Sequence, residues 1–231
     1  MGLYRQVTEM GRLIVLEGID GSGKGTQLRL LCRALESEGV PFRTLDFPRY
    51  GNRSCALAEA YLQGAFGSRP GDVNAYTAAT FFAVDRAASF LEDWGDWWRS
   101  GGLLVANRYT TSNVIHQGSK LPEGEREAFF RWLYDFEFSK LGLPKPDIVL
   151  YLDVPLEIAE AQRRRREAET NTSADIHEAD RSYLASCRAC GLHAAELLGW
   201  RRVDCARDGS MRSVEDIHRE IAGIVRTALN A

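Results

Sequence analysis

A glycine-rich segment, GIDGSGKGT, runs from Gly18 to Thr26. It follows the apolar run Arg12–Glu17 and precedes Lys24–Glu38, in which apolar residues recur at helical spacing. The segment matches the pattern G-x-x-x-x-G-K, with its hydroxyl residue one place later than usual. Glycines let phosphate oxygens approach the backbone, the helix N-terminus supplies fixed positive charge, and Lys24 adds a mobile charge. The segment therefore predicts that the chain binds a nucleoside triphosphate.

The rest of the chain alternates between strand patterns and helix patterns. The expected strands are Arg12–Glu17, Val40–Phe47, Leu103–Ala106, Asp147–Asp153 and Trp200–Cys205. The expected helices are Lys24–Glu38, Ala56–Ala65, Val73–Arg99, Pro122–Leu141, one starting at Pro155, Ser182–Leu198 and Ser213–Leu229. The polar stretch Glu167–Ala174 is expected to be a mobile loop. This order predicts an α/β fold with a parallel sheet and helices on both faces. Because no linker or repeat divides the sequence, we expect residues 1–231 to form a single domain.

Composition and charge exclude several classes of protein. The 231 residues carry 29 Lys and Arg against 32 Asp and Glu, a net charge of −3, which argues against a nucleic-acid partner. The apolar runs are too short to cross a membrane, and the first dozen residues lack the apolar core of a signal peptide. The five cysteines have no disulfide or zinc spacing, and the C-x-x-C pair at Cys187 and Cys190 falls within an expected helix. We therefore expect a cytoplasmic protein with no membrane partner.

Five motifs in this order and spacing resemble the thymidylate kinases. They are LEGIDGSGKGTQ, DFPRYGNRS, FFAVDR, NRYTTSNVIHQG and KPDIVLYLDVP, and they span Leu16 to Pro155. The resemblance implies a P-loop kinase fold with a five-stranded parallel sheet, a basic lid at about residues 163–178 and a homodimer. It also implies an ATP-dependent nucleoside-monophosphate kinase that transfers the γ-phosphoryl group of ATP to dTMP with Mg²⁺. The products are dTDP and ADP, as a step of dTTP synthesis.

The family places ATP on the glycine-rich loop. The residues implied are Gly18, Gly21, Ser22, Gly23, Lys24, Gly25 and Thr26. Gly25 stands where a serine or threonine usually binds magnesium, so the ligand is expected to be Thr26 or water. Asp153 ends its strand as a Walker-B acid does, and it is expected either to bind magnesium or to serve as a structural hydrogen-bonded acid. Asn107 is neutral where the family usually has an aspartate.

The resemblance also implies how the acceptor nucleotide binds. In the family, an acid equivalent to Asp20 reaches the sugar hydroxyl of the acceptor. An arginine after Phe47 holds the acceptor phosphate, and the chain offers Arg49 and Arg53, of which we favour Arg53. Phe82 matches the aromatic residue that stacks on thymine, and Arg86 matches the arginine that donates to the base. Four residues apart on a helix, Phe82 and Arg86 share one face.

Asn107, Arg108 and Tyr109 follow the expected strand Leu103–Ala106 and so lie at the carboxyl edge of the sheet, where ligands bind in open α/β folds. Arg108 is the candidate that clamps the phosphates of donor and acceptor during transfer. Ser112, Asn113 and Gln117 belong to the same substrate-binding patch, and Gln117 is a candidate partner for the thymine edge.

A run of four arginines, Arg163 to Arg166, lies where nucleoside-monophosphate kinases carry the lid. Thymidylate kinases place a catalytic basic residue either in the P-loop after its acid or in the lid, and the P-loop position here is Gly21. Arg163 or Arg166 is therefore expected to act on the transferring phosphoryl group, and the sequence does not choose between them. Arg164 and Arg165 are expected to lie on a solvated face. Tyr183 and Asp180 are weaker candidates for contacts on the substrate side of the lid.

Two alternatives remain open at the level of sequence. One is a kinase of another nucleotide or of a deoxynucleoside. The other is a nucleotide-binding module without catalytic activity. The base-reading segment N-K-x-D of GTPases does not occur in the chain, which argues against a GTP-dependent switch.

Overall fold

The computed structural model describes residues 10–170, 175–177 and 180–229, with only the backbone of residues 166, 167, 169 and 170. In this part of the chain a parallel sheet has five strands in the order β2-β3-β1-β4-β5. The strands are β1 (Arg12–Glu17), β2 (Phe42–Asp46), β3 (Leu103–Asn107), β4 (Ile148–Asp153) and β5 (Arg201–Asp204). The expected five-stranded parallel sheet is confirmed.

The central strands are apolar because the sheet is covered on both faces. Leu13, Ile14, Val15 and Leu16 of β1 are all fully buried. Burial on two faces turns a strand into a continuous apolar run instead of an alternating one. This is why β1, β3 and β4 are recognisable in the sequence.

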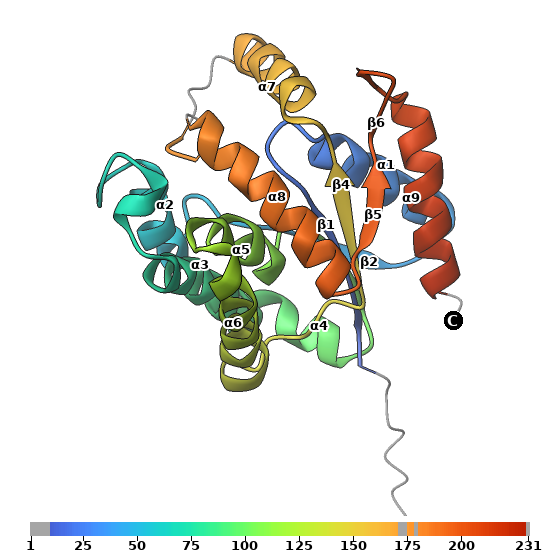
Figure 1. Cartoon of the computed structure of the whole chain (residues 1–231). Coiled ribbons are helices and arrows are strands. Elements are labelled where there is room, and N and C mark those ends of the chain that lie inside the picture. Colours follow the sequence, from blue (N-terminus) through green and yellow to red (C-terminus); the bar gives the residue numbers. More distant parts are fainter. Residues whose placement is uncertain (1–9, 171–174, 178–179, 230–231) are drawn as a thin grey trace, which may run out of the picture.

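Helices form a layer on each face of the sheet (Figure 1). Helices α1 (Lys24–Ser37) and α9 (Val214–Leu229) lie together on one face. The other face carries α3 (Ala75–Ser89), α5 (Thr110–His116) and α8 (Arg181–Leu197). The remaining helices are α2 (Ala56–Leu62), α4 (Gly95–Arg99), α6 (Glu123–Tyr134) and α7 (Leu156–Thr170).

Two of the expected long helices contain π-helical turns. The helix expected over Val73–Arg99 is interrupted at Phe90–Trp94, and the helix expected over Pro122–Leu141 becomes π-helical at Asp135–Lys140. A π turn inserts a residue into the helical ladder and is common at functional sites. The second turn carries Glu137, which is fully buried beneath the site described below.

Helix α7 extends further than the sequence predicted. A loop was expected to begin at Glu167, but α7 continues to Thr170. Arginine, glutamate and alanine dominate this stretch, and their high helix propensity outweighs the lack of large apolar side chains. The expectation for 167–170 was therefore wrong, and residues 171–174 lie outside the described residues.

Helix α5 was not predicted, because its sequence TTSNVIH is rich in residues with poor helix propensity. A buried acid at the end of β1 supports its first turn. Glu17 accepts hydrogen bonds from the Tyr109 backbone N–H at 3.1 Å, the Thr111 hydroxyl at 2.7 Å and the Ser112 hydroxyl at 2.9 Å. A carboxylate is favourable at a helix N-terminus because it meets free N–H groups and the positive end of the dipole.

A short antiparallel hairpin, β6 (Ala206–Arg207) and β7 (Ser210–Met211), was also missed. It precedes α9 and brings Met211 and Arg212 near the glycine-rich loop. Among the helices of the described residues, none has the length and apolar character needed to span a membrane.

Candidate active site

The glycine-rich loop joins β1 to α1 at the carboxyl edge of the sheet. Gly21 and Gly23 have φ values of 84° and 89°, which L side chains rarely adopt. A Cβ on Gly23 or Gly25 would meet no atom of the described chain within 4 Å, so this side of the loop is open for a ligand. At Gly21 the reason is different, because a Cβ would lie 2.1 Å from the carbonyl oxygen of Ala159 in α7. Gly21 is thus required by the packing of α7 against the loop.

Lys24, at the start of α1, is buried, and its ammonium group is held by the loop itself. Its Nζ donates to the carbonyl oxygens of Gly18 at 2.8 Å and Ile19 at 3.0 Å, and it lies 3.9 Å from Asp20 Oδ1. Carbonyl groups and a carboxylate hold the positive charge in place before any phosphate arrives.

A cavity of about 800 Å³ opens over the loop. Its lining combines the loop with α7 and the segment that leads into α9: Asp20 to Arg29, Asp46, Asn107, Arg108, Gln162, Arg165, Met211, Arg212, Val214 and Ile217. We call it the loop cavity. Its volume suits a nucleotide-sized ligand.

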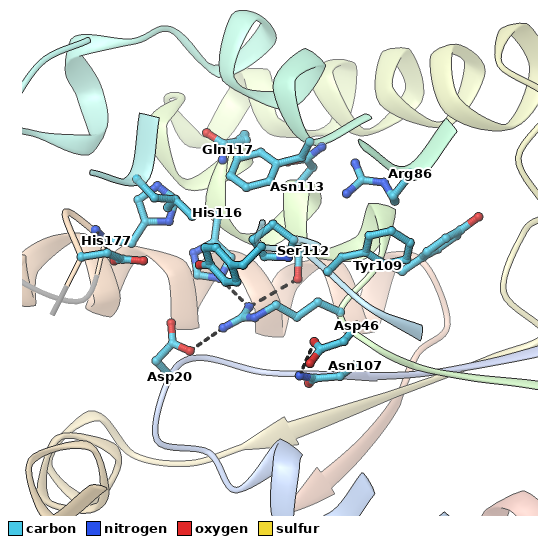
Figure 2. Close-up of a pocket in the computed structure, with 17 residues that line it drawn as sticks. Asp20, Asp46, Arg86, Asn107, Tyr109, Ser112, Asn113, His116, Gln117 and His177 are labelled. Carbon is cyan, nitrogen blue, oxygen red and sulfur yellow. Dashed lines mark hydrogen bonds and ion pairs between the residues drawn. The ribbon is translucent and has the colours of Figure 1, made fainter. Parts of the chain in front are cut away.

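A second cavity, of about 380 Å³, lies beyond the ends of β2 and β3 (Figure 2) and is called here the acceptor cavity. Its lining comes from the glycine-rich loop, the end of β2 and the loop after it, α2, α3, the end of β3, α5 and the segment 175–177. The residues are Asp20, Asp46, Phe47, Pro48, Tyr50, Leu62, Phe82, Arg86, Asn107, Arg108, Tyr109, Ser112, Asn113, His116, Gln117, Asp175 and His177. Four of them, Asp20, Asp46, Asn107 and Arg108, also line the loop cavity, so the two cavities meet at a shared wall.

Arg108 lies in this shared wall and has an unusual backbone. Its φ of 63° places a non-glycine residue in the left-handed region, and such strain is frequent at functional sites. Its Nη2 donates to Asp20 Oδ1 at 2.5 Å, and its Nη1 lies 3.4 Å from the Ser112 hydroxyl and 3.0 Å from His116 Nε2. The contacts to Asp20, Ser112 and His116 appear as dashed lines in Figure 2.

The ion pair sets the charges of both partners. Burial alone would raise the pKa of Asp20, but the nearby charges of Arg108 and Lys24 outweigh it and lower the pKa well below its usual value. Burial would lower the pKa of Arg108, and the charges of Asp20 and Glu17 raise it instead. Asp20 is therefore the ionised partner of Arg108. The family resemblance had implied only a contact between Asp20 and the sugar hydroxyl of the acceptor.

Phe82 and Arg86 both line the acceptor cavity, from one face of α3 as predicted. Arg86 is only 2% exposed and forms a bidentate pair with Glu137, from Nε at 2.6 Å and from Nη2 at 2.5 Å. Glu137 also accepts from the Thr110 hydroxyl at 2.6 Å and from Asn113 Nδ2 at 3.3 Å. Glu137 is a site residue that sequence reasoning missed, since it lies 51 residues from Arg86 in an expected amphipathic helix.

Asn113 and Gln117 reach this cavity from α5 and the turn after it. Asn113 Nδ2 is also held by the carbonyl oxygen of Ala79 at 3.0 Å, which fixes the amide. Gln117 is 1% exposed, and no hydrogen-bond partner for its Oε1 occurs among the described residues. Phe47 closes the cavity near the end of β2 and packs against Tyr109, with ring centroids 6.1 Å apart.

The two arginines expected to bind the acceptor phosphate are not among the described residues that line the acceptor cavity. Arg49 donates from its backbone N–H at 2.8 Å and from its Nε at 3.1 Å to the buried carboxylate of Asp85, and from Nη2 to Ser54. Arg53 is exposed at the start of a 3-10 turn. As far as the described residues show, the acceptor cavity is lined by Tyr50 instead of either arginine.

Asp153 does not lie in either cavity as lined by the described residues. Its carboxylate accepts from Arg188 Nε at 2.8 Å and Nη2 at 3.1 Å, and it pairs with Arg202 at 2.8 Å. Of the two roles expected for Asp153, this geometry fits the structural acid. Thr26 lines the loop cavity, where its hydroxyl lies 3.4 Å from Arg29 Nη2.

Oxygen ligands suited to magnesium gather instead at the shared wall. Asp46 Oδ1 accepts from Asn107 Nδ2 at 2.8 Å, and Asn107 Oδ1 is a buried oxygen for which the described residues provide no partner. Carboxylate and amide oxygens are ligands that Mg²⁺ prefers. The described residues hold no cluster of three or more acidic, histidine or cysteine side chains arranged as a metal site.

The lid arginines occupy different faces of α7. Arg165 is exposed, as expected, and it also lines the loop cavity. Arg163 is half-buried and is not among the described residues that line either cavity. The side chain of Arg166 lies outside the described residues. Tyr183 is buried and donates from its hydroxyl to the carbonyl oxygen of His116 at 2.8 Å, and Asp180 caps α8 by accepting from the Tyr183 N–H at 3.0 Å.

Comparisons with known proteins agree with this architecture. A family model described as thymidylate kinase matches residues 16–221. A thymidylate kinase of Mycobacterium tuberculosis (strain H37Rv) is 36% identical over 170 residues, covering 73% of this chain and 78% of that protein. A thymidylate kinase of Homo sapiens is 30% identical over 226 residues, covering 95% and 92%. A solved structure of thymidylate kinase from Candida albicans superposes with a TM-score of 0.70 at 20% sequence identity, covering 96% of this chain and 93% of that one.

Proposed function

The chain belongs to the thymidylate kinase family, and we propose that the two cavities that meet at Arg108 hold its two substrates. The family's reaction is the transfer of the γ-phosphoryl group of ATP to dTMP, which gives dTDP and ADP. The single observation that carries the proposal is the shared wall. A guanidinium group that lines a nucleotide-sized cavity on each side can contact the phosphates of donor and acceptor together.

We assign dTMP to the acceptor cavity. Phe82 offers a flat surface for the thymine ring, and Arg86, held by Glu137, offers donors at the edge of the base. The Oε1 of Gln117, for which the described residues provide no partner, adds an acceptor to the donors of Arg86, beside the fixed amide of Asn113. A base with both donors and acceptors at its edge suits such a set.

We assign ATP to the loop cavity. The open side of Gly23 and Gly25 leaves room for phosphate oxygens beside backbone N–H groups at the start of α1. Lys24 can move from its carbonyl partners to the β- and γ-phosphates. Arg165 enters this cavity from α7, so we now favour it over Arg163 as the lid arginine. We retain Arg166 as a second candidate for the lid arginine.

We propose that magnesium, held largely by water and phosphate oxygens, meets the protein at Asp46 and Asn107 and near Thr26. Bound there, it would neutralise the phosphate charge that develops during transfer. The protein's own contribution is positioning. Asp20 and Ser112 hold Arg108, the cavity walls exclude water, and the phosphates are brought into line.

We further propose that the chain acts as a homodimer, as a single domain with its lid at about residues 163–178, in the cytoplasm. Support for a dimer comes from Leu57 of α2 and from Val84 and Leu91 on one face of α3 and the turn after it, which are 47%, 44% and 78% exposed. Light scattering of the purified chain tests the dimer, and a monomer at micromolar concentration would contradict it. Support for the cytoplasm comes from the five cysteines, all of which are unpaired.

The test of function is ADP formation from ATP with dTMP, dUMP, AMP and thymidine as acceptors. We expect the highest kcat/KM with dTMP and a strict dependence on magnesium. Preference for AMP would overturn the roles of Phe82 and Arg86. Binding of ATP without acceptor-dependent turnover would overturn the assignment as an enzyme.

A further inference from the structure

Arg108 has a contact that the phosphate-clamp assignment does not explain. Besides Asp20 and Ser112, its guanidinium meets the imidazole of His116, with Nη1 3.0 Å from Nε2. His116 is the last residue of α5 and is 5% exposed. Aromatic and imidazole side chains near a strained arginine can be simple packing partners, so the chemistry of the contact has to decide its role.

A guanidinium group carries only N–H donors. His116 Nε2 must therefore accept, which requires the tautomer with its proton on Nδ1. The Nδ1 atom lies 3.5 Å from the sulfur of Cys187 in α8. An imidazole that accepts from an arginine is uncharged, because a protonated ring has no lone pair to offer.

Both the backbone and the ring of His116 are held by neighbouring residues. The backbone carbonyl oxygen of His116 accepts from the hydroxyls of Tyr183 at 2.8 Å and Ser119 at 2.9 Å, which fixes the end of α5. Its ring stacks on His177, with centroids 5.3 Å apart and an interplanar angle of 10°. His177 Nε2 in turn lies 2.8 Å from the hydroxyl of Tyr61. Both rings belong to the wall of the acceptor cavity (Figure 2).

The surroundings keep His116 uncharged. Burial, and after it the charge of Arg108, lower the pKa of His116 to about 3. Burial and the neighbouring His116 lower the pKa of His177 as well. The charged and titratable groups that face His116 are Arg108, Asp20, Lys24, Lys120, His177, Cys187 and Tyr183. Arg108 and Lys24 carry positive charge, and Asp20 is paired with both. Burial lowers the pKa of Lys120 to about 7.

We propose that His116 is a positioning residue for phosphoryl transfer, an uncharged acceptor that fixes the orientation of the Arg108 guanidinium in the wall between the two cavities. Asp20 takes Nη2 and His116 takes Nη1, so the two ends of the guanidinium are held by different elements. With both ends held, the plane of the group is set before the phosphates bind. This role rests on the proposed function of Arg108.

The test compares two substitutions of His116. His116→Leu removes the acceptor, whereas His116→Gln keeps an oxygen that can accept from Arg108. We expect His116→Leu to lower kcat by about 10- to 100-fold, which corresponds to the loss of one hydrogen bond to a charged group. The change in KM for dTMP should be smaller. His116→Gln should recover most of that loss. His193→Gln, a partly exposed histidine on α8, is the matched control and should behave as wild type.

A double-mutant cycle separates positioning from general damage to the fold. If His116 acts through Arg108, His116→Leu should cost little in an Arg108→Ala background. Losses that multiply in the double variant, or equal losses in the leucine and glutamine variants, would overturn the proposal. So would a leucine variant with kcat close to wild type.

A measurement on the unaltered protein covers the case in which the leucine variant does not fold. Nitrogen-15 NMR of histidine-labelled protein, assigned with the glutamine variants, reports the tautomer of each ring. We expect His116 to be the neutral Nδ1–H form across about pH 5 to 8. A protonated or Nε2–H ring would overturn the contact. If the wild-type protein showed no dTMP-dependent turnover, the proposed function would be refuted instead. The NMR result does not depend on turnover, so the two failures can be told apart.

Discussion

The bidentate pair between Arg86 and Glu137 allows a quantitative prediction that joins stability to substrate binding. Arg86 is 2% exposed and Glu137 is fully buried, and the carboxylate also accepts from Thr110 and Asn113. Glu137→Gln keeps the side-chain volume, so it opens no cavity. It leaves the guanidinium as a buried positive charge that faces a neutral amide.

Breaking a buried ion pair by removing one partner costs about 3–5 kcal/mol. In a chain of this size each kcal/mol shifts the Tm by roughly 2–4 °C. The Tm of Glu137→Gln is therefore expected to fall by roughly 6–20 °C. Because Arg86 lines the acceptor cavity, KM for dTMP should also rise while KM for ATP stays close to wild type.

The assay is thermal unfolding followed by circular dichroism, together with steady-state kinetics at a temperature where the variant is folded. Glu127→Gln is the control, since Glu127 forms an exposed pair with Arg131 at 3.7 Å. Exposed pairs of this kind contribute about 0.3–0.5 kcal/mol. If the Tm values of the two variants fell by similar small amounts, the burial argument for Arg86 would be refuted.

Three further predictions concern the phosphate end of the site. Arg108→Ala should lower kcat by orders of magnitude, since one preorganised donor contributes about 2.7–4 kcal/mol to the transition state. Its circular dichroism should be unchanged, and near-normal turnover would refute the phosphate-binding role of Arg108. Gly21→Ala should lower the Tm, because its Cβ would meet the Ala159 carbonyl oxygen at 2.1 Å. Gly25→Ala has open space around its Cβ, so it should leave the Tm unchanged and weaken ATP binding measured by calorimetry. The opposite order of Tm values would contradict the packing explanation. Arg165→Ala should lower kcat for ADP formation more than Arg163→Ala does, and the reverse order would assign the lid role to Arg163.

Much of the fold was predictable because its signals are local. Strand β1 was placed at Arg12–Glu17 from its apolar run alone, and α9 was placed to within one residue at its start by the Ser213 cap, whose hydroxyl accepts from the Asp216 N–H at 3.1 Å. Helix α5 was missed because its stability comes from Glu17, a partner more than ninety residues away in sequence. Propensity over a short window does not contain such a contact.

The candidate site divides in the same way. The pairing of Phe82 with Arg86 on one face followed from helical spacing, and the position of Arg108 followed from the end of a buried strand. The role of each arginine in the run 163–166 did not follow, because successive residues point about 100° apart around a helix. Which of them enters the loop cavity depends on how α7 docks against Gly21.

By itself, the sequence determined the five strands of the parallel sheet and most of the helices, the glycine-rich loop at a strand-to-helix junction and the family to which the chain belongs. These depend on residue periodicity and on backbone freedom, which are local properties. Only the tertiary structure decided the partners of the charges: Asp20 with Arg108, Glu137 with Arg86, and Asp153 with Arg188. Such pairs form between residues far apart in the chain, and their Coulomb energy depends on a separation and a burial that exist only after folding.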